Sequence, residues 1–262
     1  MSVLCVVVVY GVTQVHDVVY IVCQSSSSII RFSATTHQRL TDINVKDLRD
    51  PCDVAACELT SQLYVADWDG ECIWLVLSEG EDIQRWPPKS SSDTFRPGTL
   101  SLTSSRLLVT SRDTKRLMLL DAAGNEVRCI PLPDYMDPLH AVESPSGTFI
   151  VSHENIRLND RCQVSEVNTA GEVLRQFSRS LDWTPHIAVD SQGNILVADF
   201  GNGRILLLDA HLALHRVIIN EHELNDKRPL RLYNGKSGQL LVGFEDSYNG
   251  GIAVFDVSFV DG

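Results

Sequence analysis

A sequence pattern that repeats along the whole chain sets the strongest limit on how this protein can fold. In its clearest copy, short apolar runs lie at Ile187–Val189, Ile195–Ala198 and Ile205–Leu208, and Leu214–Ile219 adds a fourth. Runs of this length are typical of β-strands when turn residues such as those of Ser191–Asn194 separate them. This copy therefore predicts a unit of four short strands.

The same pattern occurs five more times, with varying fidelity. The residues that open consecutive copies lie 41 to 47 positions apart. They are Tyr10 in a degenerate first copy, followed by Pro51, Pro97, Pro138, Pro185 and Pro229. Four short strands in about 40–50 residues is the period of a β-propeller blade. The spacing therefore predicts six blades.

The two ends of the chain together supply one blade. The segment from Pro229 to the C-terminus holds three apolar runs, and the N-terminal run Val3–Val9 has no copy of its own. We therefore expect an all-β, six-bladed β-propeller in which the N-terminal strand completes the last blade, with residues 1–262 as a single domain. Such closure removes the exposed sheet edges of an open array. The alternative is that Val3–Val9 is a frayed or targeting segment, although it is shorter than the ~20 residues that span a bilayer.

The fifth copy resembles a known family. Residues Pro185 to Asp199, with Arg204 shortly after them, are similar to the NHL repeat. Other copies keep less of it, because Cys72 stands where arginine is expected and Ser111 replaces the aspartate. The resemblance implies that Asp199 and Arg204 form a structural, hydrogen-bonded pair. The WD40 repeat fits less well, because no Gly-His and Trp-Asp pairing recurs at the blade ends.

Six-bladed NHL propellers mostly act as binding platforms, typically in tripartite-motif ubiquitin ligases. Those ligases also contain RING and B-box zinc clusters and a coiled coil, whose patterns this sequence lacks. The resemblance therefore implies a tripartite-motif-like, non-catalytic platform without ligase activity, which binds a protein or peptide partner.

Charge and cysteine content narrow the function further. The chain has 22 Lys and Arg against 34 Asp and Glu, a net charge of −12. This balance makes nucleic acid an unfavoured partner, because phosphate contacts draw on Lys and Arg. The seven cysteines form no Cys-x-x-Cys pair, which argues against a disulfide framework or a zinc ribbon. We therefore expect a cytoplasmic monomer that binds no membrane.

In related six-bladed lactonases and amidating lyases, a metal in the central channel is held by the innermost strands, and the residue after the blade-opening proline faces the channel. The corresponding residues here are Gly11, Cys52, Gly98, Leu139, His186 and Leu230. One cysteine and one histidine, Cys52 and His186, are too few for a catalytic site with three ligands. We therefore expect no metal, no cofactor and no enzyme activity. The alternative is a propeller hydrolase or lyase with a degenerate metal site.

One face of the propeller is expected to carry the binding site. The loops between blades and those joining second to third strands share this face, and they contain more acidic than basic residues. Exposed aromatic residues near arginine are typical anchors for protein partners, whereas Trp183 and Phe244 are expected to pack between blades. RNA binding through Arg112, Lys115, Arg157 and Arg161 is the alternative. The candidate contact residues are Trp68, Phe200, Tyr248, Arg112, Arg157 and Arg161.

Overall fold

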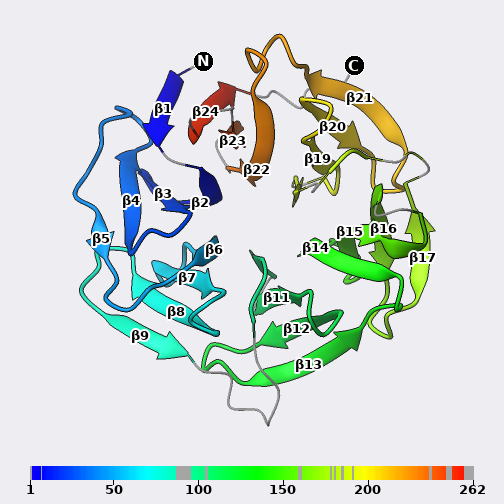
Figure 1. Cartoon of the computed structure of the whole chain (residues 1–262), viewed down its shortest axis with the longest axis horizontal. Helices are drawn as coiled ribbons and strands as arrows, with labels where there is room; N and C mark the ends of the chain where they lie inside the picture. The colour runs from blue at the N-terminus through cyan, green and yellow to red at the C-terminus, as the bar shows by residue number, and fades with distance from the viewer. Residues whose placement is uncertain are drawn as a thin grey trace.

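Six four-stranded antiparallel sheets form a ring of blades around a central axis (Figure 1). The computed structural model describes residues 2–6, 8–86, 96–103, 106–158, 161–177, 179, 181–183, 186–190, 192–235, 238–245 and 250–256. Regular structure within these ranges consists of strands and one 3-10 turn at Ile156–Leu158. No helix there is long and apolar enough to cross a membrane. The expected all-β, six-bladed propeller is confirmed.

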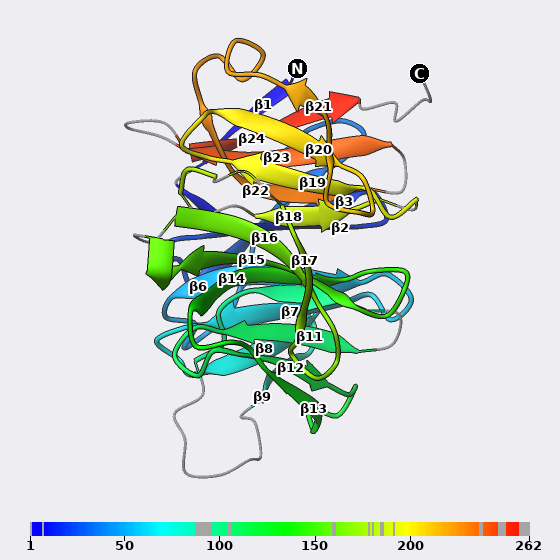
Figure 2. The same cartoon turned by 90° about the vertical axis from the view of Figure 1, so that its right-hand side faces the viewer.

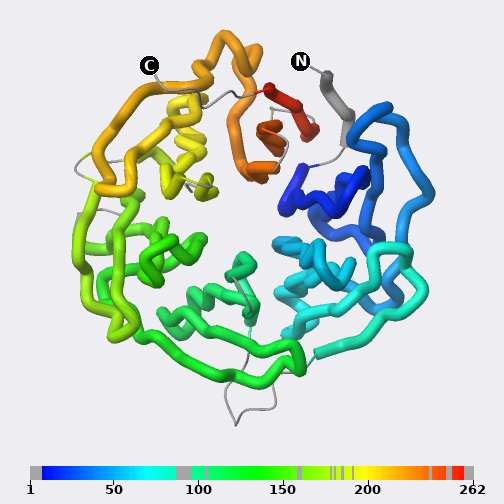
Figure 3. Tube along the Cα trace, turned by 180° about the vertical axis from the view of Figure 1, so that it is seen from behind, coloured from blue at the N-terminus to red at the C-terminus, as the bar shows by residue number. Residues whose placement is uncertain are grey.

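Each blade runs from an innermost strand near the axis to an outermost strand at the rim, as the reverse view also shows (Figure 3). Blade 1 contains β2 (Val9–Val15), β3 (Val18–Cys23), β4 (Ser28–Ser33) and β5 (Ile43–Asn44). Blade 2 contains β6 (Pro51–Cys57), β7 (Gln62–Asp67), β8 (Cys72–Leu77) and β9 (Ile83–Trp86). Blade 3 contains β10 (Leu100–Leu102), β11 (Leu107–Ser111), β12 (Arg116–Leu120) and β13 (Glu126–Pro131).

The other three blades follow the same order, and Figure 2 shows them stacked side by side when the ring is seen edge-on. Blade 4 contains β14 (Met136–Glu143), β15 (Phe149–Asn155), β16 (Arg161–Val167) and β17 (Val173–Gln176). Blade 5 contains β18 (Ile187–Val189), β19 (Ile195–Asp199), β20 (Arg204–Leu208) and β21 (Leu214–Ile219). Blade 6 contains β22 (Arg228–Asn234), β23 (Gln239–Glu245), β24 (Gly250–Asp256) and β1 (Ser2–Val6).

The ring is closed by the N-terminal strand, as the sequence predicts. β1 pairs antiparallel with β24, from Ser2 opposite Val254 to Val6 opposite Gly250, and Figure 1 shows the two strands side by side in blue and red. The apolar run Val3–Val9 is not one strand, however, because Val9 already belongs to β2 of the first blade. Its N-terminal part closes the ring, and its end opens blade 1.

The buried apolar residues in the described part of the chain form six clusters, each lying between two neighbouring blades. The cluster between blades 6 and 1 brings Leu241 and Ile252 together with Val12 and Ile21. It joins the two ends of the repeat array through side chains, in addition to the backbone pairing of β1. Burial of apolar surface between adjacent sheets is therefore continuous around the ring.

Buried aspartates fasten the loops that connect the blades. The Asp67 carboxylate accepts hydrogen bonds from the backbone N–H groups of Arg49, Asp50 and Gly70 at 2.9–3.1 Å and from the indole of Trp74 at 3.0 Å. In blade 5, the equivalent carboxylate of Asp199 has its own set of donors. They are the Asp182 N–H at 3.2 Å, the Asn202 amide at 3.0 Å and Arg204 at 2.7 Å. The Asp199–Arg204 pair that the family resemblance implies is present, and its role is structural.

Candidate site in the central channel

The innermost strand of each blade, or the residue just before it in blades 3 and 5, contributes one residue at the same level of the channel. Asp53 lies opposite Ala66 on the neighbouring strand, and Arg231 lies opposite Gly243 in the same way. The carbonyl of His186 accepts a hydrogen bond from the Ala198 N–H. The six residues at this level are Gly11, Asp53, Thr99, His140, His186 and Arg231.

The observed channel residue differs from the predicted one in blades 2, 3, 4 and 6. β-bulges in the innermost strands account for the difference in blades 2, 4 and 6. The pairing register shifts between Pro51 and Asp53, between Pro138 and His140, and between Pro229 and Arg231. A bulge inserts one extra residue into a strand. The side chains after it therefore point to the opposite face from the one that simple alternation would give. In blades 2, 3, 4 and 6 the channel residue is two positions after the proline. In blade 5 it is one position after, at His186.

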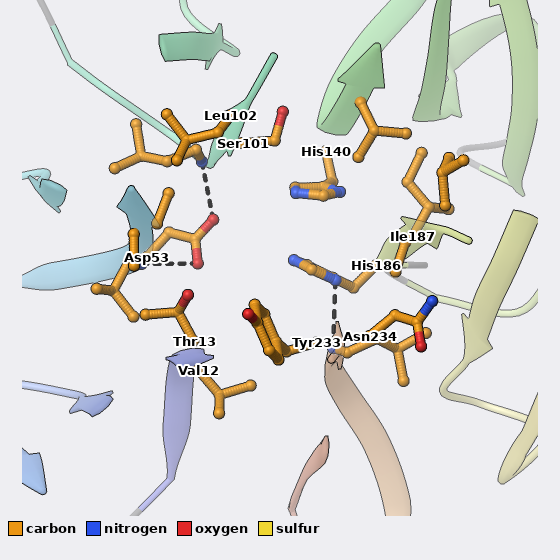
Figure 4. A pocket seen from close by; sticks show the side chains of 18 residues that line it. Val12, Thr13, Asp53, Ser101, Leu102, His140, His186, Ile187, Tyr233 and Asn234 are labelled. Carbon is orange, nitrogen blue, oxygen red and sulfur yellow. Dashed lines mark hydrogen bonds between the residues drawn. The ribbon is translucent and has the colours of Figure 1, made fainter. Parts of the chain in front are cut away.

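The prediction that the channel offers only one cysteine and one histidine is therefore wrong. A second histidine, His140, and a carboxylate, Asp53, stand at the centre. The ligand atoms of Asp53, His140 and His186 all lie within 4.8 Å of one another, and the three side chains are buried. Figure 4 shows the Asp53 carboxylate on one side of the cavity, facing the edges of the two imidazole rings.

The two histidines form a stacked pair. Their ring centroids are 3.8 Å apart and the ring planes differ by 24°. Burial, with a smaller contribution from the positive charge of Arg231, lowers the pKa of His140 to about 3. The pKa of His186 is also lowered, first by burial and then by His140 and Arg231. Both imidazoles are therefore neutral at physiological pH.

The carboxylate of Asp53 is held by backbone groups of two blades. One oxygen accepts a hydrogen bond from the Val54 N–H at 2.8 Å, and the other accepts one from the Leu100 N–H at 2.8 Å. Burial raises the pKa of Asp53 to about 6, although Arg231 and these two donors oppose the shift. The Arg231 guanidinium is fixed by the Tyr10 carbonyl, to which its Nε donates at 2.5 Å.

Two cavities meet at the histidine pair. One, of about 230 Å³, is lined by Asp53, Thr13 and Tyr233 together with both histidines. The other, of about 180 Å³, is lined by Trp68, Arg112, Arg231 and Cys52 together with the same histidines. The second cavity opens among the loops of the predicted binding face, and we call it the mouth cavity. A ligand in either cavity can therefore reach His140 and His186.

The two predicted channel residues occupy different places. His186 is at the centre of the channel. Cys52 lines the mouth cavity instead, where its thiol donates to the carbonyls of Pro97 and Gly98 at 3.2 and 3.0 Å. Burial raises the pKa of this thiol, so Cys52 is a protonated donor at physiological pH.

The aromatic residues predicted for the binding face behave differently from one another. Trp68 is partly exposed and lines the mouth cavity. Phe200, expected at the surface, is only 6% exposed, because Trp183 and Arg228 cover its ring. Trp183, expected to pack between blades, is instead 61% exposed. Phe244 is buried as predicted, and Tyr248 lies outside the described residues.

The predicted basic residues lie on this face, but the side chains of Arg112 and Lys115 already interact with neighbouring groups of the protein. Arg112 forms ion pairs with Asp137 at 2.7 Å and with Glu154 at 2.9 Å. Lys115 donates to the carbonyl of Asp134 at 2.6 Å. Arg157 and Arg161 are exposed, and the Arg157 guanidinium lies over the ring of Tyr135, 4.7 Å from its centroid.

Sequence reasoning missed Asp53, His140, Thr99 and Arg231. All four stand two residues after a blade-opening proline, but this position by itself does not indicate a bulge. A bulge has no distinctive residue pattern in these strands, so the channel position in each blade was visible only from the pairing of the strands.

Comparison with known families and structures supports the fold. The family model of the NHL repeat matches residues 187–206, so the fifth copy is an NHL repeat within a six-bladed propeller. No curated protein matches the sequence.

Solved structures match over nearly the whole chain. A catalytically inactive virginiamycin B lyase from Staphylococcus aureus, determined with quinupristin, has a TM-score of 0.67 at 12% identity, covering 94% of this chain and 80% of its own. A streptogramin B lyase has a TM-score of 0.65 at 14% identity, covering 94% and 79%. The hydrazine synthase of Kuenenia stuttgartiensis has a TM-score of 0.67 at 14% identity, covering 97% and 96%. At these identities the likeness concerns the fold alone.

Proposed function

We propose that this propeller is a non-catalytic platform that binds an extended segment of a partner protein across the mouth of its channel. The observation that carries the proposal is Trp68, which is partly exposed and forms part of the wall of the mouth cavity. An indole next to a cavity provides apolar contact area at low entropic cost, and aromatic residues of this kind dominate the energy of protein interfaces.

A second exposed tryptophan supports an extended ligand. Trp183 belongs to the loop between blades 4 and 5, whereas Trp68 belongs to the β7–β8 loop of blade 2. Blades 2 and 5 lie on opposite sides of the ring (Figure 1). A segment that crosses the mouth could therefore contact both indoles and fill the cavity between them.

The charges around the mouth favour a peptide over RNA. Arg96 lies over the Trp68 ring, 5.8 Å from its centroid, and also contacts Glu71 at 3.4 Å and Asp113 at 3.9 Å. Arg112 is paired with two carboxylates. Phosphate binding would have to compete with these acidic partners, whereas apolar and basic residues of a peptide would not.

Selection from a phage-displayed random peptide library, using the intact chain, tests this proposal. We expect the selected peptides to bind the Trp68→Ala variant at least about 30-fold more weakly, which corresponds to ~2 kcal/mol. Leu59→Ala is the matched control, because Leu59 is 95% exposed but lies in the β6–β7 turn at the opposite end of the blade. Equal binding to wild type and Trp68→Ala would contradict the proposal.

Filter binding with single-stranded RNA at low and physiological salt tests the alternative. Salt-sensitive RNA binding that is lost when Arg112, Lys115, Arg157 and Arg161 are replaced, and that is unaffected by Trp68→Ala, would favour the RNA-binding hypothesis. The hydrolase or lyase alternative depends on the residues at the channel centre and not on those of the loop face.

A further inference from the structure

The centre of the channel concentrates ionisable groups that are costly to bury. Asp53, His140 and His186 lie together in the interior, with Arg231 beside them. Apolar side chains could fill this part of the interior at a lower free-energy cost, because a buried carboxylate or imidazole loses the water that hydrates it. Such groups occur together most often where they bind something.

One nitrogen of this cluster lacks a well-formed hydrogen bond. Nδ1 of His140 is buried and has no hydrogen-bond partner within the described part of the chain, although backbone groups of Leu100 and Ile187 lie close enough to the ring to raise its pKa slightly against the effect of burial. Unpaired buried polar atoms are rare in native structures, and such an atom often marks a place where an ion or a water molecule binds. The unpaired atom belongs to the same side chain that lines both cavities.

We propose that Asp53, His140 and His186 bind a divalent transition-metal ion, of the zinc type, at the centre of the channel. Two imidazoles and one carboxylate are a common ligand set for Zn²⁺, in which three protein ligands leave a further position open. The two cavities would give a small ligand access to that open position. This proposal is independent of peptide binding at the loop face.

The distances require a modest closure of the site. Ligand atoms around a zinc ion are about 3.3 Å apart, since each lies about 2.0–2.1 Å from the metal, whereas here the atoms lie within 4.8 Å of one another. The stacked rings must also turn toward a common point. The adjoining cavity of about 230 Å³ leaves room for this rotation.

Two interactions oppose metal binding, and the first is a hydrogen bond to His186. The Leu232 N–H donates to Nδ1 of His186 at 3.3 Å, so the neutral ring carries its proton on Nε2. Binding through Nε2 needs the other tautomer and gives up this long hydrogen bond. The bonds that zinc forms to its protein ligands are strong enough to outweigh the loss of one such hydrogen bond.

The second opposing interaction is electrostatic. The positive charge of Arg231 acts on Asp53 and on both histidines, so it repels a cation bound between them. The repulsion is reduced when Asp53 is ionised, since the negative charge of its carboxylate offsets part of the positive charge nearby. Arg231→Gln is therefore expected to tighten metal binding, an outcome that a purely structural cluster would not produce.

Titration of the intact, metal-free chain with Zn²⁺ by calorimetry, and with Co²⁺ by visible spectroscopy, tests the site. We expect one tightly bound ion per chain, and weakening by ~100-fold or more in Asp53→Asn and His140→Gln. Cys52→Ser and His222→Gln are the matched controls, because the first thiol lines the mouth cavity and the second imidazole is exposed. Both should bind the ion as wild type does. Mg²⁺ and Ca²⁺, which prefer oxygen ligands, should not compete.

Amide NMR supplies a readout that does not depend on the variants. Zinc should change the Leu232 amide resonance, because the hydrogen bond to His186 is lost when the ring binds metal. Absence of a stoichiometric ion in wild type, or equal binding by folded Asp53→Asn, would overturn the proposal. A sulfur-to-cobalt charge-transfer band would also overturn it, since it would place the ion on the cysteines.

Discussion

The guanidinium of Arg204 donates a hydrogen bond of 2.7 Å to the carboxylate of Asp199, which is completely buried at the end of β19. The same carboxylate holds the backbone of the incoming loop through the Asp182 N–H. The pair therefore connects the second and third strands of blade 5 with the segment that arrives from blade 4. A small polar network fixes the position of a loop on the proposed binding face.

Replacing Asp199 with alanine is expected to destabilise the protein by about 2–3 kcal/mol, because two other donors and the 37%-exposed Arg204 lose a buried charged acceptor. Urea unfolding followed by fluorescence measures the change. Asp69→Ala is the control, since Asp69 is exposed in the corresponding type of loop of blade 2. Equal stability of the two variants would show that the Asp199 network contributes nothing.

Removing residues 1–6 is expected to lower the melting temperature and to cause association. The deletion takes away β1 and exposes the hydrogen-bonding edge of β24, and an unpaired edge recruits other strands. The loss should amount to several kcal/mol, a large part of the stability of a typical domain. Size-exclusion chromatography with thermal unfolding tests this, and a monomer with an unchanged melting temperature would refute closure by β1. Val9 must be retained, because it is buried in β2.

His153 is expected to make the protein less stable in mild acid. Burial lowers the pKa of its imidazole to about 4, whereas an unfolded histidine titrates near 6.5. Between these values the unfolded chain binds a proton that the folded chain excludes, so stability falls as the pH falls from about 6.5 toward 4, by ~1.4 kcal/mol per pH unit. His140 and His186 act in the same direction.

The contribution of His153 can be separated by substitution. His153→Gln should reduce the slope of unfolding free energy against pH by about one proton over this range. His222→Gln should leave the slope unchanged, because the His222 side chain is exposed. An unaltered slope in His153→Gln would mean that this imidazole is protonated in the folded protein.

Gly11 is expected to be intolerant of any side chain. A Cβ there would lie 2.6 Å from the Val54 nitrogen and 2.9 Å from Oδ1 of Asp53. Gly11→Ala should therefore cost about 1–3 kcal/mol through overpacking and should displace Asp53. Gly147→Ala is the comparison, because its Cβ meets no atom within 4 Å and only the positive φ of 77° opposes it. A smaller loss of stability in Gly11→Ala than in Gly147→Ala would contradict the close packing at the channel.

Phe200 and Trp183 should give opposite results in stability and binding. Phe200→Ala removes a buried ring and is expected to cost about 3–5 kcal/mol in unfolding free energy. Trp183→Ala removes an exposed ring and should change stability much less, but it should weaken peptides selected on the loop face. Thermal unfolding and fluorescence polarisation measure the two effects. The reverse pattern would mean that Phe200 is the contact residue.

The repeat in the sequence was sufficient to predict the architecture, because each blade is a local unit whose strands pair with their neighbours in the chain. The period near 44 residues, the turns between apolar runs and the three-strand C-terminal remainder all follow from residue order. The Asp199–Arg204 pair was implied by the resemblance to the NHL repeat, and it too is local, since both residues belong to one hairpin.

Only the tertiary structure decided what occupies the channel and which aromatic rings reach solvent. Asp53, His140 and His186 are far apart in the chain, and a bulge of one residue in β6 and β14 determines that the first two face the axis. Phe200 is covered by Trp183 of the incoming loop, and that contact depends on how two neighbouring blades pack. The pattern of apolar residues specifies which strands form, whereas the register at a bulge and the packing between blades specify where individual side chains point.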